Sequence, residues 1–428
     1  MSKASDHLVV SQYVSVIGGA LETDQVCCDG GRISTITVPG CWGPIITPRV
    51  TGGHEVTAPV KVEGAMPGDS IAIYVEKLKI VSKFGSTGTG RPIPGRFDGD
   101  PSVKAVCPKC KTVCPDTVLV GFGEDAIRCA NCGEVALPQT YDSGVTVAFS
   151  QEDDIAVALA PEGAKRVAEM TAKGEVFLPE GAQQHLATIL GRADVFGLPI
   201  RQRPMIGNIG CVPAVAIPSA KNAGDCIGSL AKTDRFAVPA KEDITDAHMD
   251  INEVGEGCIV IAPVRVEGGG VYIGDVHLTQ GDGEIAGHTL DMCADVTIRV
   301  KVLKGLELDG PILLPVVSEL DSRFVPFSDE EYARAQKLYQ DFGGGVLPRS
   351  YPIQIVGSGS GMDAALQDAL QRAVKLTGLS MGEIKNRATL GGELGIGRTI
   401  GMVYLTVFLE EAVLEKAGLL ELVREQYC

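Results

Sequence analysis

Residues 271–291 concentrate the side chains of this chain that are able to do chemistry. Five polar side chains fall within ten residues: Asp275, His277, Gln280, Asp282 and Glu284. Carboxylates and imidazoles bind hard or borderline divalent cations, and a carboxylate left over can act as a base. A polar turn with solvated charges is the alternative interpretation. The density of the charges and the alternating Gly281 and Gly283 favour a site, because such glycines mark a tight turn or a close backbone approach.

An apolar run precedes this motif and predicts the strand that would position it. Val271–Ile273 is typical of a buried strand. If the strand continues, Asp275 and His277 are two residues apart and point to one face. A second group of polar residues lies upstream, in the sequence D-A-H-M-D-I-N, which contains His248 and Asp250.

Two C-x-x-C pairs predict a separate metal site of a different kind. The pairs are Cys107 with Cys110 and Cys129 with Cys132, separated by eighteen residues. Two such pairs at this distance are typical of a zinc ribbon, in which four thiolates close a tetrahedral, redox-inert site. A segment with so little core needs the metal to fold, so we expect a structural Zn²⁺. The ribbon carries no basic patch, which argues against nucleic-acid binding.

Composition narrows the class of protein. The 428 residues include 53 Gly and 24 Pro with only 5% aromatic residues, a balance that favours many short strands and tight turns. The net charge of −16 disfavours nucleic acid and anionic membranes as partners and favours a neutral or cationic small molecule. Thirteen scattered cysteines, no visible secretory signal and no apolar run long enough for a membrane span predict a cytoplasmic protein.

Patterning along the chain predicts four parts. They are a β-rich part at 1–103, the zinc ribbon at 104–136, a second β-rich part at 137–320 and a helical region at 321–428. Within the first part, the Gly, Pro and Ser of 82–103 predict a long loop, and 201–214 has the same loop character. Helices are expected at 161–172, about 181–190, 328–342, 363–377 and 400–422, with capping boxes at Ser328 and Ser380.

The order of these motifs resembles the acetamidase/formamidase family. The resemblance is carried by G-G-H-E-V-T-A-P-V around His54, H-M-D-I-N-E-V, and above all G-D-V-H-L-T-Q-G-D-G-E-I-A-G at 274–287, and it covers about half the chain. It implies an α+β, β-rich sandwich or barrel body with an inserted zinc ribbon and a C-terminal helical region. Members of the family are metal-dependent homo-oligomers that hydrolyse small neutral aliphatic amides to a carboxylate and ammonia.

The resemblance also implies roles for individual residues. Asp250, Asp275 and His277 would hold a divalent cation, Zn²⁺ by preference, which acidifies water and polarises the amide carbonyl. Glu284 would be the general base and then the acid. His54 would donate a hydrogen bond to the oxyanion, and Gln280 and Asp282 would contact the substrate. Asp282 is an alternative for the role of Asp250 or of Glu284.

Departures from the family pattern leave the substrate open. This chain has His248 where the family has Asn, Asp291 where the central motif commonly closes with Glu, and Arg203–Met205 without the usual pocket His. They motivate a rival hydrolase that acts on a cyclic or bulkier amide such as a lactam. A rival of another class is a binding module that keeps zinc at the four cysteines and has none at Asp275 and His277.

Overall fold

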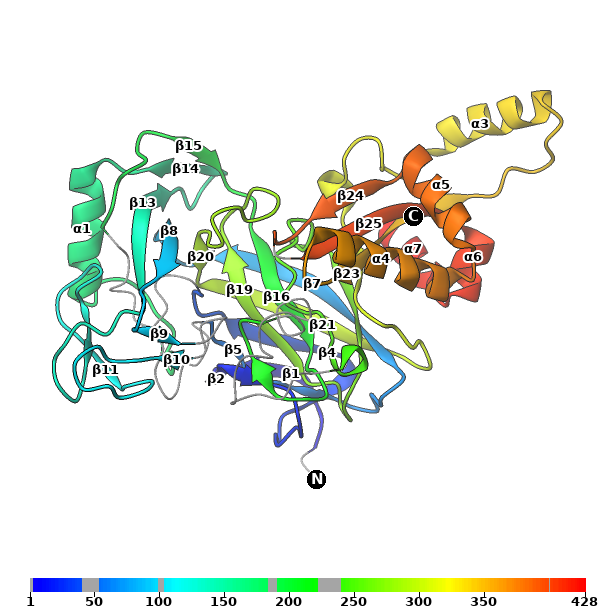
Figure 1. Ribbon diagram of the computed structural model, residues 1–428. Coiled ribbons are helices and arrows are strands. Elements are labelled where there is room, and N and C mark those ends of the chain that lie inside the picture. Colours follow the sequence, from blue (N-terminus) through cyan, green and yellow to red (C-terminus); the bar gives the residue numbers. More distant parts are fainter. Residues whose placement is uncertain (1–2, 41–53, 99–103, 184–190, 222–239, 400) are drawn as a thin grey trace.

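A computed structural model of the chain describes residues 3–40, 54–98, 104–183, 191–221, 240–399 and 401–428. Its elements are mainly strands in several sheets, with a few helices gathered at the two ends of the molecule (Figure 1). This arrangement confirms the predicted α+β, β-rich class. The expected helix at about 181–190 falls largely outside the described residues.

A ten-stranded sheet is the largest sheet of the fold, and its strands follow the order β1-β4-β21-β7-β18-β22-β23-β25-β24 with β6 beside β4. Its strands are β1 (Ser5–Val10), β4 (Val26–Ile36), β6 (Lys61–Val62), β7 (Ser70–Ile80), β18 (Ile259–Pro263), β21 (Ala294–Leu303), β22 (Ile312–Leu314), β23 (Ser350–Ser358), β24 (Glu393–Ile396) and β25 (Met402–Glu410). Since strands from both ends of the chain pair in it, the sheet runs across the expected boundary at residue 320.

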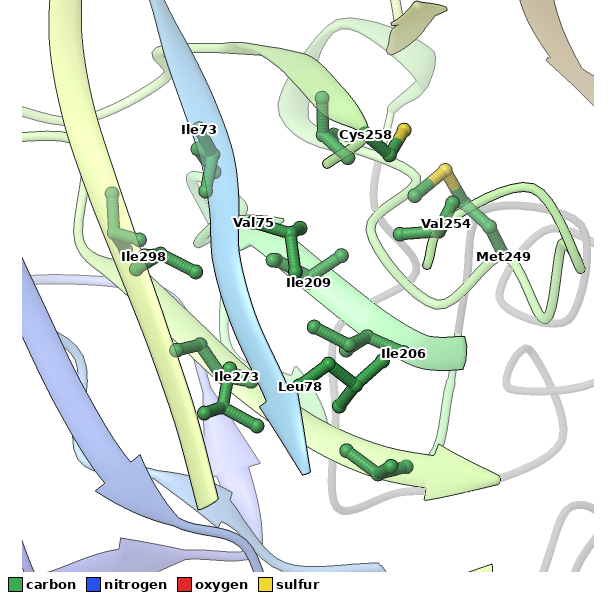
Figure 2. Packing of buried hydrophobic residues seen from close by; sticks show 14 of the residues in the cluster. Ile73, Val75, Leu78, Ile206, Ile209, Met249, Val254, Cys258, Ile273 and Ile298 are labelled. Carbon is green, nitrogen blue, oxygen red and sulfur yellow. The ribbon is translucent and has the colours of Figure 1, made fainter. Parts of the chain in front are cut away.

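A second sheet packs on the first and contains strands of the 271–291 segment. It contains β16 (Met205–Cys211), β19 (Val271–His277), β5 (Val56–Thr57), β2 (Tyr13–Val14) and β20 (Asp291–Met292). Figure 2 shows Ile73 of β7 and Ile298 of β21 facing Ile206 and Ile209 of β16 and Ile273 of β19. Because side chains alternate along a strand, β7 buries its other face with Ala72 and Tyr74 in a second core.

A third, four-stranded sheet lies at one end of the molecule with the cysteine segment (Figure 1). It consists of β8 (Phe84–Pro92), β13 (Gln139–Phe149), β14 (Ile155–Ala158) and β15 (Pro199–Arg201), beside α1 (Pro161–Ala172). The remaining short strands are β3 (Val16–Ile17), β9 (Phe97–Asp98), β10 (Lys104–Ala105), β11 (Thr117–Leu119), β12 (Ile127–Cys129) and β17 (Ile217–Pro218).

Two loop predictions were wrong, and glycine is the reason in both. Residues 84–92 pair with β13 over their length as β8, and residues 205–211 form the buried strand β16. Glycine usually weakens a strand, so a Gly-rich run indicates a loop. Here glycine is needed for close approach: a Cβ on Gly85 would collide with Met292, and one on Gly210 would lie 2.7 Å from the Cβ of Ala247.

Four C-terminal helices pack at the other end of the large sheet: α4 (Met362–Thr377), α5 (Met381–Gly391), α6 (Glu411–Lys416) and α7 (Leu420–Tyr427). A fifth, α3 (Asp329–Asp341), has no buried residue and projects away from the sheet (Figure 1). The short 3-10 helices are η3 (Lys241–Asp243) and η4 (Val317–Glu319). Both predicted capping boxes are confirmed, at Ser328 and Ser380. No helix in the described ranges is long and apolar enough to cross a membrane.

The helix expected at 400–422 is wrong in its first half. Residues 402–410 form the strand β25, which pairs with β23 and β24, and only residues from 411 onward are helical. A strand buried on both faces has a continuous apolar run rather than an alternating one, so its pattern is hard to distinguish from that of a core helix. The region after residue 320 therefore contributes strands as well as helices.

Candidate metal centre and catalytic site

The site is built where the β16–β19 ladder is interrupted. Ile206 pairs with Val276 and Asn208 with Gly274 in one continuous register, and only the pair of Gly207 with Asp275 between them is missing, where the φ of Asp275 is 55°. A Cβ on the opposing Gly207 would collide with the Asp250 carboxylate. The loop that carries Asp250 is held on the same glycine, because Met249 N and Asp250 N both donate to Gly207 O. Glycine in β16 therefore lets two carboxylates meet.

Asp250, Asp275 and His277 come together as predicted, in a buried cluster. One ligand atom from each lies within 4.8 Å of the others. His277 Nε2 is 3.4 Å from Asp275 Oδ1 and 3.9 Å from Asp250 Oδ1, and each of the three residues is about 1% exposed or less. The expected convergence of Asp275 and His277 is thus present, although the backbone between them is not a regular strand.

The spacing of these atoms fits a cation better than direct hydrogen bonds. Two ligands at 2.0–2.1 Å from a tetrahedral Zn²⁺ are about 3.3 Å apart, whereas a direct hydrogen bond is about 2.9 Å long. Asp250 Oδ1, Asp275 Oδ1 and His277 Nε2 are also buried without a hydrogen bond among the described residues. Buried polar atoms rarely stay unsatisfied, so the donor set fits a bound divalent ion.

The two kinds of ligand differ in charge state. Burial alone would lower the pKa of His277, but the charges of Asp275 and then Asp291 raise it well above its usual range, so a metal ion would have to displace a proton from this imidazole. Burial alone would raise the pKa of Asp275, but the adjacent His54 and His277 outweigh it and hold that pKa well below its usual range. The carboxylate is therefore ionised, which metal binding requires.

Glu284 lies beside this cluster in the state expected of a general base. Its side chain is 8% exposed, and its backbone N donates to Gly281 O. Burial, followed by the negative charge of Asp250, raises the pKa of Glu284 to about 7. A general base with a pKa near neutrality is largely ionised at physiological pH and still binds a proton strongly enough to remove it from water.

Backbone strain is concentrated in the same place. Six non-glycine residues of the described ranges have positive φ, and three of them are Asp250 at 49°, Asp275 at 55° and Glu284 at 43°. Residues held in this sparsely populated region cost free energy and persist only where the surrounding structure imposes them. The strain falls on the residues predicted to act.

Gln280 and Asp282, the two residues predicted to contact the substrate, each have hydrogen-bond partners within the protein. Gln280 Oε1 is 2.8 Å from His277 Nδ1, and its Nε2 donates to Asp250 O at 2.7 Å. The side-chain amide of Gln280 thus contacts both His277 and the backbone of Asp250. A hydrogen bond to Nδ1 fixes the orientation of the His277 ring, as partners of metal-binding imidazoles do. Asp282 is exposed and accepts a hydrogen bond from Asn252 Nδ2 at 2.7 Å.

Three further side chains complete the site, and no motif indicated their roles. His248 Nε2 is 2.8 Å from Asp275 Oδ2, and Arg398 Nη1 is 3.2 Å from His248 Nδ1. Arginine can only donate, so His248 accepts at Nδ1 and donates from Nε2 to Asp275. Arg398 Nε also lies 3.2 Å from Asp250 Oδ2, and Asp291 Oδ1 lies 3.5 Å from His277 Nε2.

His54 lies on the other side of Asp275. Its Nδ1 is 3.0 Å from Asp275 Oδ1, and its side chain is 12% exposed. His54 therefore lies at the cluster. Because its Nδ1 faces Asp275, the predicted hydrogen bond to an oxyanion would have to use the other ring nitrogen, Nε2.

The four ribbon cysteines also come together. Their ligand atoms all lie within 4.8 Å of one another, with Cys107 Sγ 3.5 Å from Cys132 Sγ and Cys110 Sγ 3.7 Å from Cys129 Sγ. Four thiolates around one Zn²⁺ at 2.3 Å are about 3.8 Å apart, so the cluster has the size of a tetrahedral site. The hydrogen bond with Thr112 is the leading cause that lowers the pKa of Cys110 to about 6.

Comparison with known proteins decides the family. The model of the acetamidase/formamidase family matches residues 34–242 and 220–381 of this chain. The chain belongs to the acetamidase/formamidase family. The match includes His54, the four cysteines and the whole of the 271–291 motif.

Individual relatives match more locally. A Schizosaccharomyces pombe protein named as a formamidase is 39% identical over 92 residues, which are 20% of this chain and 22% of that protein. The acetamidase of Mycolicibacterium smegmatis is 30% identical over 147 residues, 30% of this chain and 36% of the relative. The chain thus spans about a fifth to a third of these relatives. The structure of acetamidase from Yersinia enterocolitica covers 95% of this chain and 92% of its own, with a TM-score of 0.52 and 17% identity, which supports the fold.

Proposed function

We propose that this acetamidase/formamidase family member hydrolyses a small aliphatic amide to a carboxylate and ammonia. The observation that carries the proposal is the buried Asp250–Asp275–His277 cluster next to the buried carboxyl of Glu284. A divalent cation, Zn²⁺ by preference, would be held by those three residues and would supply Lewis-acid polarisation of the carbonyl and acidification of water.

The protein groups then move one proton. Glu284 accepts it from the attacking water and returns it to the leaving nitrogen, so that the C–N bond breaks with ammonia as the product. Gln280 holds the His277 ring through Nδ1, and Arg398 with His248 holds the carboxylates of Asp250 and Asp275. We therefore propose an orienting role for Gln280 in place of the substrate contact expected from sequence.

Ammonia release from formamide and acetamide tests this function directly. We expect turnover of at least one of them by the purified chain, loss of turnover after removal of the metal with a chelator, and recovery on adding Zn²⁺. A protein that holds metal at the Asp250–Asp275–His277 cluster and releases no ammonia from any amide offered would contradict the proposal.

The substrate panel should include a cyclic amide, because the lactam alternative stays open. Two of the sequence departures that motivate it involve residues with contacts inside the fold. Arg203 forms ion pairs with Glu319 and Glu253, and Met205 is buried in β16 opposite His277. Asp291 is buried beside His277. Preferential cleavage of the lactam over linear amides would favour the alternative.

The four cysteines are proposed to hold a structural Zn²⁺. We expect the Cys110→Ser/Cys129→Ser variant to lose one Zn²⁺ per chain and to become sensitive to proteolysis between residues 104 and 136, because this segment has little core of its own. Elemental analysis and limited proteolysis would measure both effects. The matched control is Cys28→Ser, which removes a thiol from β4 outside the cluster. Unchanged zinc content in the double variant would contradict the structural site.

A further inference from the structure

Helix α3 and the segment that returns from it, residues 328–348, form an arm that projects from the C-terminal end of the molecule (Figure 1). None of the 13 residues of α3 is buried. The arm is nevertheless held together by its own contacts. Gln336 Oε1 accepts a hydrogen bond from Leu347 N at 2.7 Å, and Gln336 Nε2 donates to Gly345 O at 2.9 Å. The arm therefore has a defined shape, although its helix is not packed into the rest of the protein.

One side of the arm presents an apolar surface to solvent. Leu338, Tyr339 and Phe342 follow Ala335 at the spacing of a single helical face. Their side chains are 62%, 45% and 84% exposed, and that of Val346 on the returning segment is 87% exposed. Together these four side chains expose on the order of 500 Å² of apolar area, more than a monomeric protein usually leaves in one patch. We therefore expect a partner to cover the arm.

An open apolar groove lies at the opposite end of the molecule, on the four-stranded sheet. The helix α1 covers one face of that sheet, where Val167 joins the buried cluster that contains Val147 and Ala156. Ile155 and Val157 flank Ala156 along β14, so they point to the other face, and they are 54% and 40% exposed.

A cavity of about 270 Å³ lies on this open face and is lined by residues between 148 and 157, most of them apolar. We call it the β14 groove. It is smaller than the about 300–1,000 Å³ of typical small-molecule sites, which favours a side chain of another protein as its occupant.

We propose that the arm of one chain docks in the β14 groove of a second copy of this chain. Figure 1 places α3 and β14 at opposite ends of the molecule, so the arm lies far from the groove of its own chain. The surfaces are both apolar and have opposite charges beside them. Arg334 and Lys337 are exposed on α3, whereas Glu152 and Asp153 are exposed next to the groove. Opposite charges around an apolar contact align two partners. In a chain with a net charge of −16, they also reduce the repulsion between copies.

The area of the arm is sufficient for a specific contact. With matching area from the groove, one docked arm buries about 1,000 Å², the lower limit of a specific interface. Each chain carries both an arm and a groove, so a closed assembly uses every copy of both surfaces, and in a dimer the two contacts together bury about 2,000 Å². The acidic first turn of α3, Asp329 to Glu331, argues against an anionic membrane as the occupant. The inference goes beyond the proposed function, because it does not depend on amide hydrolysis.

Sedimentation velocity of the purified full chain tests the proposal. We expect the wild type to be an oligomer at micromolar concentration. Phe342→Asp in the arm and Ile155→Asp in the groove should each raise the dissociation constant at least about 30-fold, because each places a charge in an apolar contact that excludes water. Both side chains are exposed in the single chain, so circular dichroism should show an unchanged fold. The matched control is Gln340→Asp, which adds the same charge on the opposite side of α3 and should associate as the wild type does.

Photo-cross-linking locates the contact without removing an apolar side chain. A photoreactive phenylalanine analogue at position 342, in a mixture of light and heavy-isotope-labelled chains, should cross-link to residues 148–157 of another chain. Cross-links to residues 328–348 of the other chain would show that two arms pair with each other, and would overturn the assignment of the groove. A wild type that sediments as a monomer would overturn the proposal, as would association of Phe342→Asp or Ile155→Asp at wild-type strength.

Discussion

Replacing Glu284 by glutamine is expected to lower kcat for amide hydrolysis by about 10²–10⁴-fold, the usual contribution of a positioned acid–base group. Glutamine has the same shape and keeps the packing of a side chain that is 8% exposed, but it cannot accept a proton from water. Glu284 is not among the predicted ligands, so metal content should stay at the wild-type value. Steady-state ammonia release and elemental analysis on one sample would measure both quantities.

The pKa of Glu284 also predicts how the rate of amide hydrolysis falls at low pH. Burial and then the charge of Asp250 raise the pKa of Glu284 to about 7. Only the ionised carboxylate can act as base, so kcat/KM in the wild type should fall as pH drops through about 7. An exposed-site control, Glu330→Gln in the first turn of α3, should leave both rate and profile unchanged. Full turnover in Glu284→Gln would refute the assignment of the base.

The convergence of Asp275 and His277 could be predicted from sequence because these residues are close together in the chain. Asp275 to Glu284 spans one strand end and one turn, so spacing alone indicates that these side chains meet. The cysteine pairs are similar, since each lies on a tight turn of its own: Lys111 N donates to Cys107 O, and Gly133 N donates to Cys129 O.

Residues contributed by distant segments could not be predicted in this way. Arg398 reaches Asp250 from the loop between β24 and β25, more than a hundred residues along the chain, and that loop is held by Thr399 N donating to Gly283 O. Gly40, where a Cβ would collide with Asp275 and Asp291, matters by lacking a side chain, which has no signature in a single sequence. The close approach of Asp250 to β19 depends on Gly207 in the neighbouring strand, in a segment whose Gly and Pro content indicated a loop.

Arg372 also contacts residues that are distant in the sequence, and its replacement should cause the largest loss of stability that we expect. Arg372→Met should lower the free energy of unfolding by about 3–5 kcal/mol, the usual cost of removing one partner from a buried ion cluster. Arg372 Nη2 on α4 lies 2.6 Å from Asp246 Oδ2 and 2.7 Å from Asp368 Oδ2, while Nη1 donates to Val356 O. Methionine keeps much of the volume and leaves two buried carboxylates without the guanidinium between them. Denaturant unfolding would measure the loss.

The effect should reach the metal centre through the chain. Asp246 has a φ of 53° and lies four residues before Asp250, so release of its carboxylate from Arg372 should loosen the segment that presents this proposed metal ligand. We expect weaker metal binding in Arg372→Met as well as lower stability.

The matched control is Arg91→Met, which breaks an ion pair with Asp142 between side chains that are 68% and 52% exposed and should cost less than about 1 kcal/mol. Replacing Arg372, Asp246 and Asp368 together by apolar or neutral residues should recover much of the loss, because the main penalty is the burial of two carboxylates that have lost the guanidinium between them. A loss in Arg372→Met no greater than in Arg91→Met would show that the cluster does not hold this segment in place.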